Sequence, residues 1–263
     1  GRDAGGVFNV LVSSAELLVT GFEMDRWKHG GLGGSKVMLA YANSSVASWQ
    51  LTNAIAPPTP NHRCFAGEPT VAELSDGSLL VMIRNEGGSL WHSTSSQNGN
   101  TLRLLPPTQS RLMSSDSPSF LLRLRHDAWS TRGRAPAGHG PLLILWANAG
   151  TTWPLACNAG DDVPCVYTIR SVLHAALSFD NGKSWKGHRE VYRDPCARGD
   201  CFRNHRDYGV AYSSALEQSD GTVLVKTGQG VGHWGSFVLD PWWLLEVSQQ
   251  ADFSAVASRP CHR

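Results

Sequence analysis

An eight-residue segment, Ser178–Trp185, has the sequence SFDNGKSW and contains the residues of a complete tight turn. Asp180 can accept hydrogen bonds from backbone amides of its own turn, and Gly182 can adopt a positive φ without a steric cost. The ring of Trp185 can pack beneath such a turn and close it. The segment therefore predicts a rigid β-turn between two strands.

Two other segments carry parts of the same pattern at the same offsets. Ser95–Leu102 keeps the serine, the glycine and the threonine, whereas Gln97 stands in place of the aspartate. Ala42–Trp49 keeps only the final Ser-Trp pair. Three such turns in order along one chain predict a repeated structural unit.

A second repeat is a hairpin with an Asp-Gly turn. Residues 68–84 are expected to form a strand, a turn at Asp76 and a second strand. Residues 211–226 repeat this arrangement around Asp220, and residues 117–146 repeat it with a polar insertion. Apolar positions alternate or form short blocks, which predicts an all-β chain. Sheets of about four strands that recur every 50 to 80 residues or so are typical of propeller blades, and we expect about four to five blades.

The composition excludes several classes of function. With 27 glycines, 14 prolines and 10 tryptophans in 263 residues, the chain is rich in turn-forming and aromatic residues, as all-β proteins are. A formal net charge of +1 argues against nucleic acid or an acidic membrane surface as a partner. Apolar runs stay short of the roughly 18 residues that cross a bilayer, so no membrane span is predicted. The ten histidines lack metal-site spacing, and neither a metal nor a cofactor is expected.

The cysteines bear on the cellular compartment. They are Cys64, Cys157, Cys165, Cys196, Cys201 and Cys261. The second and third lie close in sequence within polar loops, as do the fourth and fifth, and short disulfides there would leave the outer two for a long-range pair. Free thiols are the alternative. With the glycosylation sequon at Asn43, the disulfide interpretation predicts an extracellular, secretory or lysosomal protein.

Two arginines stand where apolar strands end. Arg84 follows the apolar run 79–83, and Arg170 follows residues 166–169 and precedes a further strand. Strand interiors exclude charge unless it reaches a cavity or a partner. Two strand-end arginines from different blades could converge on one anion, for which a planar carboxylate is the natural choice. The alternative is a pair of rim salt bridges.

These residues occur in an order that resembles sialidases. Ser178–Trp185 resembles the Asp box, S-x-D-x-G-x-[ST]-W, of sialidases and related β-propellers. Glu68, followed by proline and sixteen residues before Arg84, is similar to the sialidase blade that carries a Glu-Pro glutamate and the second arginine of a carboxylate-binding triad. Arg170 resembles the third triad arginine. Tyr212, within Ala-Tyr-Ser, resembles the segment that carries the nucleophilic tyrosine.

The resemblance implies a fold and an activity. The fold would be a sialidase-like β-propeller, six-bladed in that family, with residues 1–263 forming a single domain that is incomplete on its N-terminal side. The activity would be that of an exo-α-sialidase-like glycoside hydrolase, which removes terminal sialic acid from glycoconjugates by a retaining mechanism. Its partners would be sialylated or other acidic glycans. In the family the Asp box lies on the outer rim of a blade, away from substrate.

The resemblance also implies roles for four residues. Tyr212 would attack the anomeric carbon and Glu68 would take its proton, which makes a phenol with an ordinary pKa near 10 a usable nucleophile. Arg84 and Arg170 would hold the carboxylate of the sugar.

Other positions and functions compete with this interpretation. Tyr208 competes with Tyr212, and Glu68 could instead be an exposed strand-entry residue, because the following proline favours an extended conformation. The family's Arg-Ile-Pro motif is absent from the sequence, and Glu23 and Asp25 are both candidates for the acid. A non-catalytic propeller that binds acidic carbohydrate is one alternative. A polysaccharide lyase with Tyr212 as the base is another.

Overall fold

The computed structural model describes the chain in segments. They are residues 5–12, 18–24, 27–28, 31–32, 36–42, 48–57, 66–85, 88–98, 101–114, 117–125, 127, 129, 139–148, 152–155, 165–168, 170, 172–193, 209–228 and 234–246. Within these segments nearly all regular structure is β-strand, and the predicted all-β class is confirmed. No helix in the described part of the chain is long and apolar enough to cross a membrane.

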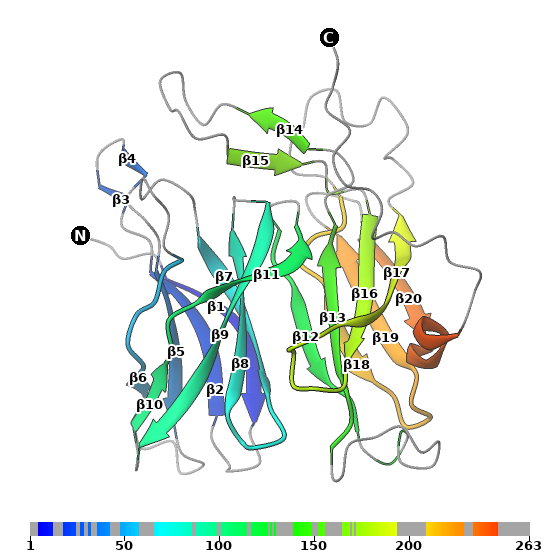
Figure 1. Cartoon of the computed structure of the whole chain (residues 1–263), viewed down its shortest axis with the longest axis horizontal. Coiled ribbons are helices and arrows are strands. Elements are labelled where there is room, and N and C mark those ends of the chain that lie inside the picture. Colours follow the sequence, from blue (N-terminus) through cyan, green and yellow to red (C-terminus); the bar gives the residue numbers. More distant parts are fainter. Residues whose placement is uncertain are drawn as a thin grey trace.

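Four antiparallel sheets form the body of the described chain, and we call them blades 1 to 4 (Figure 1). Blade 1 contains β1 (Gly5–Val12), β2 (Leu18–Met24), β5 (Lys36–Ala42) and β6 (Gln50–Leu51). Blade 2 contains β7 (Ala66–Glu73), β8 (Leu79–Asn85), β9 (Ser89–Asn98), β10 (Thr101–Leu104) and β11 (Thr108–Met113). Blade 3 contains β12 (Phe120–Arg123), β13 (Leu142–Ala147), β16 (Val172–Ser178) and β17 (Lys186–Arg193). Blade 4 contains β18 (Ser214–Glu217), β19 (Val223–Gly228) and β20 (Trp234–Leu239).

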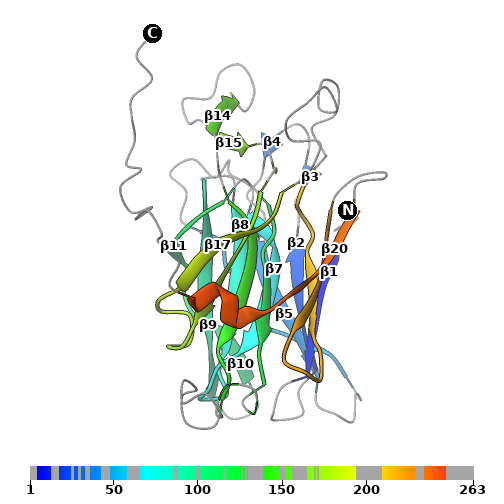
Figure 2. The same ribbon diagram turned by 90° about the vertical axis from the view of Figure 1, so that its right-hand side faces the viewer.

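Two short hairpins and one helical turn complete the described elements. The hairpins pair β3 (Trp27–Lys28) with β4 (Gly31–Leu32), and β14 (Thr152–Leu155) with β15 (Cys165–Thr168). Both project from the same end of the blades in two perpendicular views (Figures 1 and 2). The 3-10 helix η3 (Pro241–Leu245) follows β20 and packs against β17.

The first strand of each blade along the chain lies beside the first strand of the next blade. β7 contacts β1, and β12 contacts both β7 and β18. The strands β7 and β12 run in the same direction, because Leu121 N–H donates to Thr70 Oγ1 near their starts and Arg123 Nε donates to the Glu73 carbonyl near their ends. Residues that precede or begin these inner strands therefore gather at one end of the molecule.

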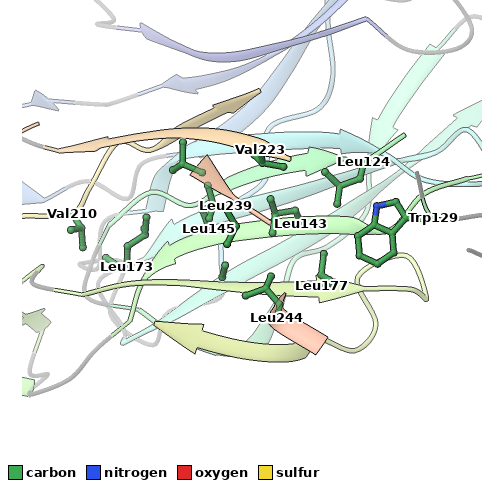
Figure 3. Packing of buried hydrophobic residues seen from close by; sticks show 13 residues of the cluster. Leu124, Trp129, Leu143, Leu145, Leu173, Leu177, Val210, Val223, Leu239 and Leu244 are labelled. Carbon is green, nitrogen blue, oxygen red and sulfur yellow. The ribbon is translucent and has the colours of Figure 1, made fainter. Parts of the chain in front are cut away.

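The hydrophobic core lies between the blades. The strand β13 shows why: its sequence LLILWA is apolar without alternation, which is typical of a strand buried on both faces. Leu143 and Leu145 pack in the cluster shared with blade 4 (Figure 3), whereas Leu142 and Ile144 pack in the cluster shared with blade 2. A third cluster joins blades 1 and 2. Face-to-face packing of sheets thus holds the blades together.

The two predicted Asp-Gly hairpins are confirmed and share one turn chemistry. Asp76 Oδ1 accepts hydrogen bonds from the amide and the hydroxyl of Ser78, at 3.0 and 2.6 Å. Asp220 Oδ1 accepts the same two bonds from Thr222, at 2.9 and 2.7 Å. Both following glycines have positive φ, 80° and 86°. The turns of blades 2 and 4 are therefore equivalent in these hydrogen bonds and in the conformation of the glycine.

The intact Asp box forms the predicted turn between β16 and β17. Asp180 accepts the Ser184 amide at 2.8 Å and the Ser184 hydroxyl at 2.5 Å, while Ser178 Oγ accepts the Gly182 amide at 2.7 Å. Trp185 packs against the cluster between blades 2 and 3. The box lies at the end of β16, whereas Arg170 precedes its start, so the turn is structural and distant from that arginine.

The segment Ser95–Leu102 forms a different turn from the one its pattern suggests. The strand β9 continues through Gln97 to Asn98, which pairs with Thr101, so the connection is a two-residue hairpin loop. Ser95 Oγ accepts a hydrogen bond from the Leu79 amide at 2.8 Å, so this hydroxyl bonds to β8 within the sheet. Gln97 replaces the aspartate of the motif, and β9 continues past this position to pair with β10.

Several expectations fall outside the described part of the chain. These are the turn of the third Asp-box-like segment, the side chains of all six cysteines and the sequon at Asn43.

Candidate active site

Glu68 lies in a β-bulge at the start of the inner strand of blade 2. Gly67 pairs with Arg84 and Thr70 pairs with Met82, so β7 carries one residue more than β8 over this interval. The φ of Glu68 is 40°, in the left-handed region, although the following proline favours an extended conformation. Its side chain is only 11% exposed. The alternative of an exposed, extended strand-entry residue is therefore wrong.

Tyr212 occupies the same position in blade 4. It precedes Asp220 by eight residues, as Glu68 precedes Asp76. Ser214 pairs with Lys226, but the Gly228 amide donates to the Ala211 carbonyl at 3.0 Å, so one extra residue is again present. The φ of Tyr212 is 49°. Bulges next to active sites commonly redirect a side chain. Here one bulge redirects the Glu68 side chain and an equivalent bulge redirects the Tyr212 side chain.

The two redirected side chains meet. The Tyr212 hydroxyl donates to Glu68 Oε1 at 2.8 Å, although 144 residues separate the two positions. Arg84 Nη1 donates to the other carboxylate oxygen, Oε2, at 2.5 Å, and its side chain is 12% exposed. The carboxylate of Glu68 is thus held between a phenol and a guanidinium group. Three of the four site residues expected from the sequence are in direct contact.

Arg170, the fourth residue, lies beside the segment that leads into Tyr212. Its backbone forms a parallel bridge with Gly209, and its carbonyl accepts the Val210 amide at 2.6 Å. A Cβ atom on Gly209 would lie 1.9 Å from that carbonyl oxygen, so only glycine permits this approach. The arginine is 3% exposed. The contact ties the position of Arg170 to that of Tyr212.

The phenol of Tyr212 is strongly perturbed. Burial, together with the negative charge of Glu68 and the hydrogen bond to it, raises the pKa of Tyr212 to about 12, while Arg84 and Arg170 act in the opposite direction. Both arginine charges therefore lie close enough to act on the same phenol. At neutral pH the phenol remains protonated and is a hydrogen-bond donor to a carboxylate, which is the arrangement required before a proton transfer between them.

Other sequence candidates are not placed. Asp25 and Tyr208 lie outside the described residues, and Glu23 is described only as a backbone position in β2. Within the described segments, no group of three or more histidine, cysteine, aspartate or glutamate side chains could hold a metal ion.

The shared spacing to the Asp-Gly turn is a signal that the sequence reasoning did not use. Counting eight residues back from Asp76 and from Asp220 reaches Glu68 and Tyr212, without reference to any family. Gly209 and Thr227, which contact the segment around Tyr212, were also missed. Neither has a distinctive local pattern, because both matter through partners that are distant along the chain or across the sheet.

Comparison with known proteins identifies this architecture. The model of the BNR repeat-like domain family matches residues 28–225. No curated protein matches the chain.

Among solved structures, the NanB sialidase from Streptococcus pneumoniae is 14% identical with a TM-score of 0.52, over 89% of this chain and 31% of that one. The Trypanosoma rangeli sialidase in complex with sialic acid is 16% identical with a TM-score of 0.51, over 89% and 31%. The same sialidase with 2,3-difluorosialic acid as a covalent intermediate is 17% identical with a TM-score of 0.51, over 89% and 30%.

These similarities establish the fold. The chain has the strand architecture of sialidase β-propellers, and it spans less than a third of the length of those solved chains.

Proposed function

The chain belongs to the family of BNR repeat-like domains, and we propose that it carries part of the active site of an exo-α-sialidase-like glycoside hydrolase. The observation that carries the proposal is the 2.8 Å hydrogen bond from the Tyr212 hydroxyl to the Glu68 carboxylate. This bond joins two strained backbone positions in different blades. Inner strands can contact each other without left-handed backbone conformations, and such conformations are typical of functional sites.

The proposed chemistry begins with Tyr212 as the nucleophile. Its oxygen forms a bond to the anomeric carbon while the glycosidic C–O bond breaks, the phenolic proton passes to Glu68, and a separate carboxylic acid gives its proton to the departing glycosidic oxygen. Because burial and Glu68 keep the phenol neutral, it approaches an anionic sugar without charge repulsion. Water then attacks the same carbon and gives a proton to the carboxylate that protonated the leaving group, and Glu68 returns its proton to the phenolate as the sugar is released. Two displacements retain the anomeric configuration.

The proposed substrate is a terminal sialic acid or a related 2-keto acid sugar. Arg84 and Arg170 both act on the phenol and present positive charge beside it. Guanidinium groups match the geometry of a carboxylate, so they would hold the carboxylate that this sugar carries on its anomeric carbon. Solved proteins of the same fold include one with sialic acid bound. Sialylated glycans are therefore the proposed partners.

Release of a fluorogenic sialoside by the full-length gene product tests the proposal. We expect release by the wild type, and a loss of about 10²-fold or more in kcat for Tyr212→Phe, which keeps the ring and removes the nucleophile. Glu68→Gln is the companion variant, since it keeps the hydrogen-bonding shape and removes the base.

Two other outcomes would replace the proposal. Binding of free sialic acid without release of product would support a non-catalytic propeller that binds acidic carbohydrate. An unsaturated product from an acidic polysaccharide would support a lyase in which Tyr212 is the base.

A further inference from the structure

The bulges of blades 2 and 4 are equivalent in backbone but differ in the residue that follows. In blade 2 the residue after Glu68 is Pro69, and in blade 4 the residue after Tyr212 is Ser213. The positions across the sheet also differ: Ile83 and Thr227 each lie seven residues after the turn aspartate. One blade thus has a proline where the other has a serine that faces a threonine.

The serine and the threonine bond to each other. Ser213 Oγ donates to Thr227 Oγ1 at 2.9 Å, and Thr227 is fully buried, with 0% exposure. Because Thr227 is buried, water does not readily replace Ser213 as its partner, and loss of the Ser213 hydroxyl leaves the Thr227 hydroxyl without this bond. This bond links the residue after Tyr212 directly to β19.

A left-handed non-glycine residue must be held by its surroundings, because that conformation costs about 1–3 kcal/mol. The chain before Tyr212 is held by two backbone bonds, from the Val210 amide to Arg170 and from the Gly228 amide to Ala211. After Glu68, the ring of Pro69 fixes φ by its covalent geometry. After Tyr212 there is no such ring, and the Ser213 hydroxyl bond takes its place.

We propose that Ser213 and Thr227 are positioning residues for Tyr212. Their hydroxyl bond holds the bulge that directs the Tyr212 phenol at Glu68, in the way that Pro69 holds the bulge of Glu68. The inference deepens the proposed hydrolase function and rests on it for its kinetic consequences. Its structural part, the placement of the Tyr212 ring, does not depend on turnover.

The kinetic test compares three changes with the wild-type full-length protein. Thr227→Val removes the hydroxyl at nearly constant volume, and Thr227→Ser keeps it. Ser213→Pro combined with Thr227→Val places a proline directly after Tyr212, as Pro69 follows Glu68 in blade 2. Thr227→Val should lower kcat for a fluorogenic sialoside by about 10-fold to 100-fold, because small displacements of a reacting group have effects of that size.

The pattern across the variants separates positioning from packing. KM should change little in Thr227→Val, since the arginines are untouched, and Thr227→Ser should retain kcat close to that of the wild type. The double variant should recover most of the lost kcat. Wild-type kcat in Thr227→Val would overturn the proposal, and so would a loss that the double variant does not recover at all.

A second readout follows the Tyr212 ring without any activity. Residues 1–263 contribute five tyrosines, and in the full-length protein with 3-fluorotyrosine incorporated, the ¹⁹F NMR resonance that disappears in Tyr212→Phe is assigned to Tyr212. Thr227→Val should shift or broaden that resonance, and Thr227→Ser should leave it in place. An unchanged resonance in Thr227→Val would contradict the proposal. If the resonance responds as expected while the wild type releases no sialic acid, the positioning role stands and the hydrolase proposal fails.

Discussion

At the scale of single residues, backbone strain coincides with the proposed chemistry. Three non-glycine residues in the described segments have positive φ, and two of them are Glu68 and Tyr212. The third, Asn181, lies in the Asp-box turn, where asparagine tolerates the left-handed region. A glutamate before a proline and a bulky tyrosine do not share that tolerance. Their conformation is imposed by the sheet pairing around them.

The strain itself can be measured at Tyr212. Both Tyr212→Ala and Tyr212→Gly remove the phenol, but glycine adopts φ of 49° freely, so Tyr212→Gly should be more stable than Tyr212→Ala by about 1 kcal/mol. Urea unfolding of the two variants gives the comparison. Ser214, which lies within β18, is the control: there the glycine variant should be the less stable one. The same order at both positions would contradict the strained conformation.

Gly209 gives a second prediction at this scale. Gly209→Ala would place a Cβ atom 1.9 Å from the Arg170 carbonyl oxygen and must push the two segments apart. We expect lower sialoside turnover, because Arg170 and Tyr212 lose their common support, together with a lower melting temperature. Gly77→Ala is the matched control, since Gly77 also has positive φ but no atom lies within 4 Å of the added carbon. If the two variants behave alike in turnover, close approach at Gly209 has no role in the site.

At the scale of elements, the Asp box joins blades rather than building the site. Besides closing its own turn, it places Asn181 where the side chain contacts the turn of blade 2: Asn181 Nδ2 donates to Ser75 Oγ at 2.6 Å, and Asn181 Oδ1 accepts the Ser75 amide at 3.1 Å. Arg123 of β12 donates to the same Oδ1. The turn therefore connects neighbouring blades at the end of β16 that is remote from Arg170.

Asp180→Ala should consequently separate stability from activity. The variant removes the acceptor of both Ser184 bonds and should lower the free energy of unfolding by about 1–3 kcal/mol. Sialoside KM and kcat, measured well below the melting temperature, should stay at wild-type values. Ser184→Ala, which removes only one of the two bonds, should cost less. A fall in kcat without a fall in stability would place the box in the catalytic machinery and contradict this account.

Local sequence patterns were sufficient to predict some turns, but they did not predict others or the bulges. The turns at Asp76, Asp180 and Asp220 were predictable, because their chemistry is contained within a few consecutive residues. The turn after Gln97 was not, since the pairing of β9 with β10 overrides a partial motif. The bulge at Glu68 was missed for a similar reason: Pro69 favours an extended neighbour, and only the register with β8 shows the extra residue.

At the scale of the whole molecule, a half-buried histidine lies beside the core that joins blades 2 and 3. His174 of β16 lies opposite Glu190 and beside the ring of Trp146, with ring centroids 5.7 Å apart. Burial lowers its pKa to about 4, with Glu190 acting in the opposite direction and His188 and Arg193 adding to the decrease. A histidine that stays neutral when folded makes the stability of the fold depend on pH.

The sign of that dependence follows from linkage. The unfolded chain binds a proton at His174 below about pH 6.5, whereas the folded chain does so only near pH 4. The free energy of unfolding should therefore fall as the pH falls from about 6.5 toward 4. Melting temperatures of the wild type and of His174→Gln over this range provide the test, and the variant should show the shallower slope. Equal slopes would assign the dependence to other groups.

The meeting of Glu68, Arg84 and Tyr212 is also a property of the whole molecule. Their convergence was expected from the order of family-like segments, but their contact depends on inner strands of separate blades lying side by side, which no local pattern encodes. The acid that the proposed hydrolysis requires was not predictable, because Glu23 and Asp25 offered no basis for a choice.

Covalent trapping would show whether Tyr212 is a nucleophile activated by Glu68. The full-length protein is incubated with 2,3-difluorosialic acid, and intact-mass and peptide mass spectrometry locate any adduct. We expect one sugar bound to the peptide that contains Tyr212, with no adduct in Tyr212→Phe and slower labelling in Glu68→Gln. Labelling at another residue, or a wild type that turns over sialoside yet never carries the adduct, would contradict it.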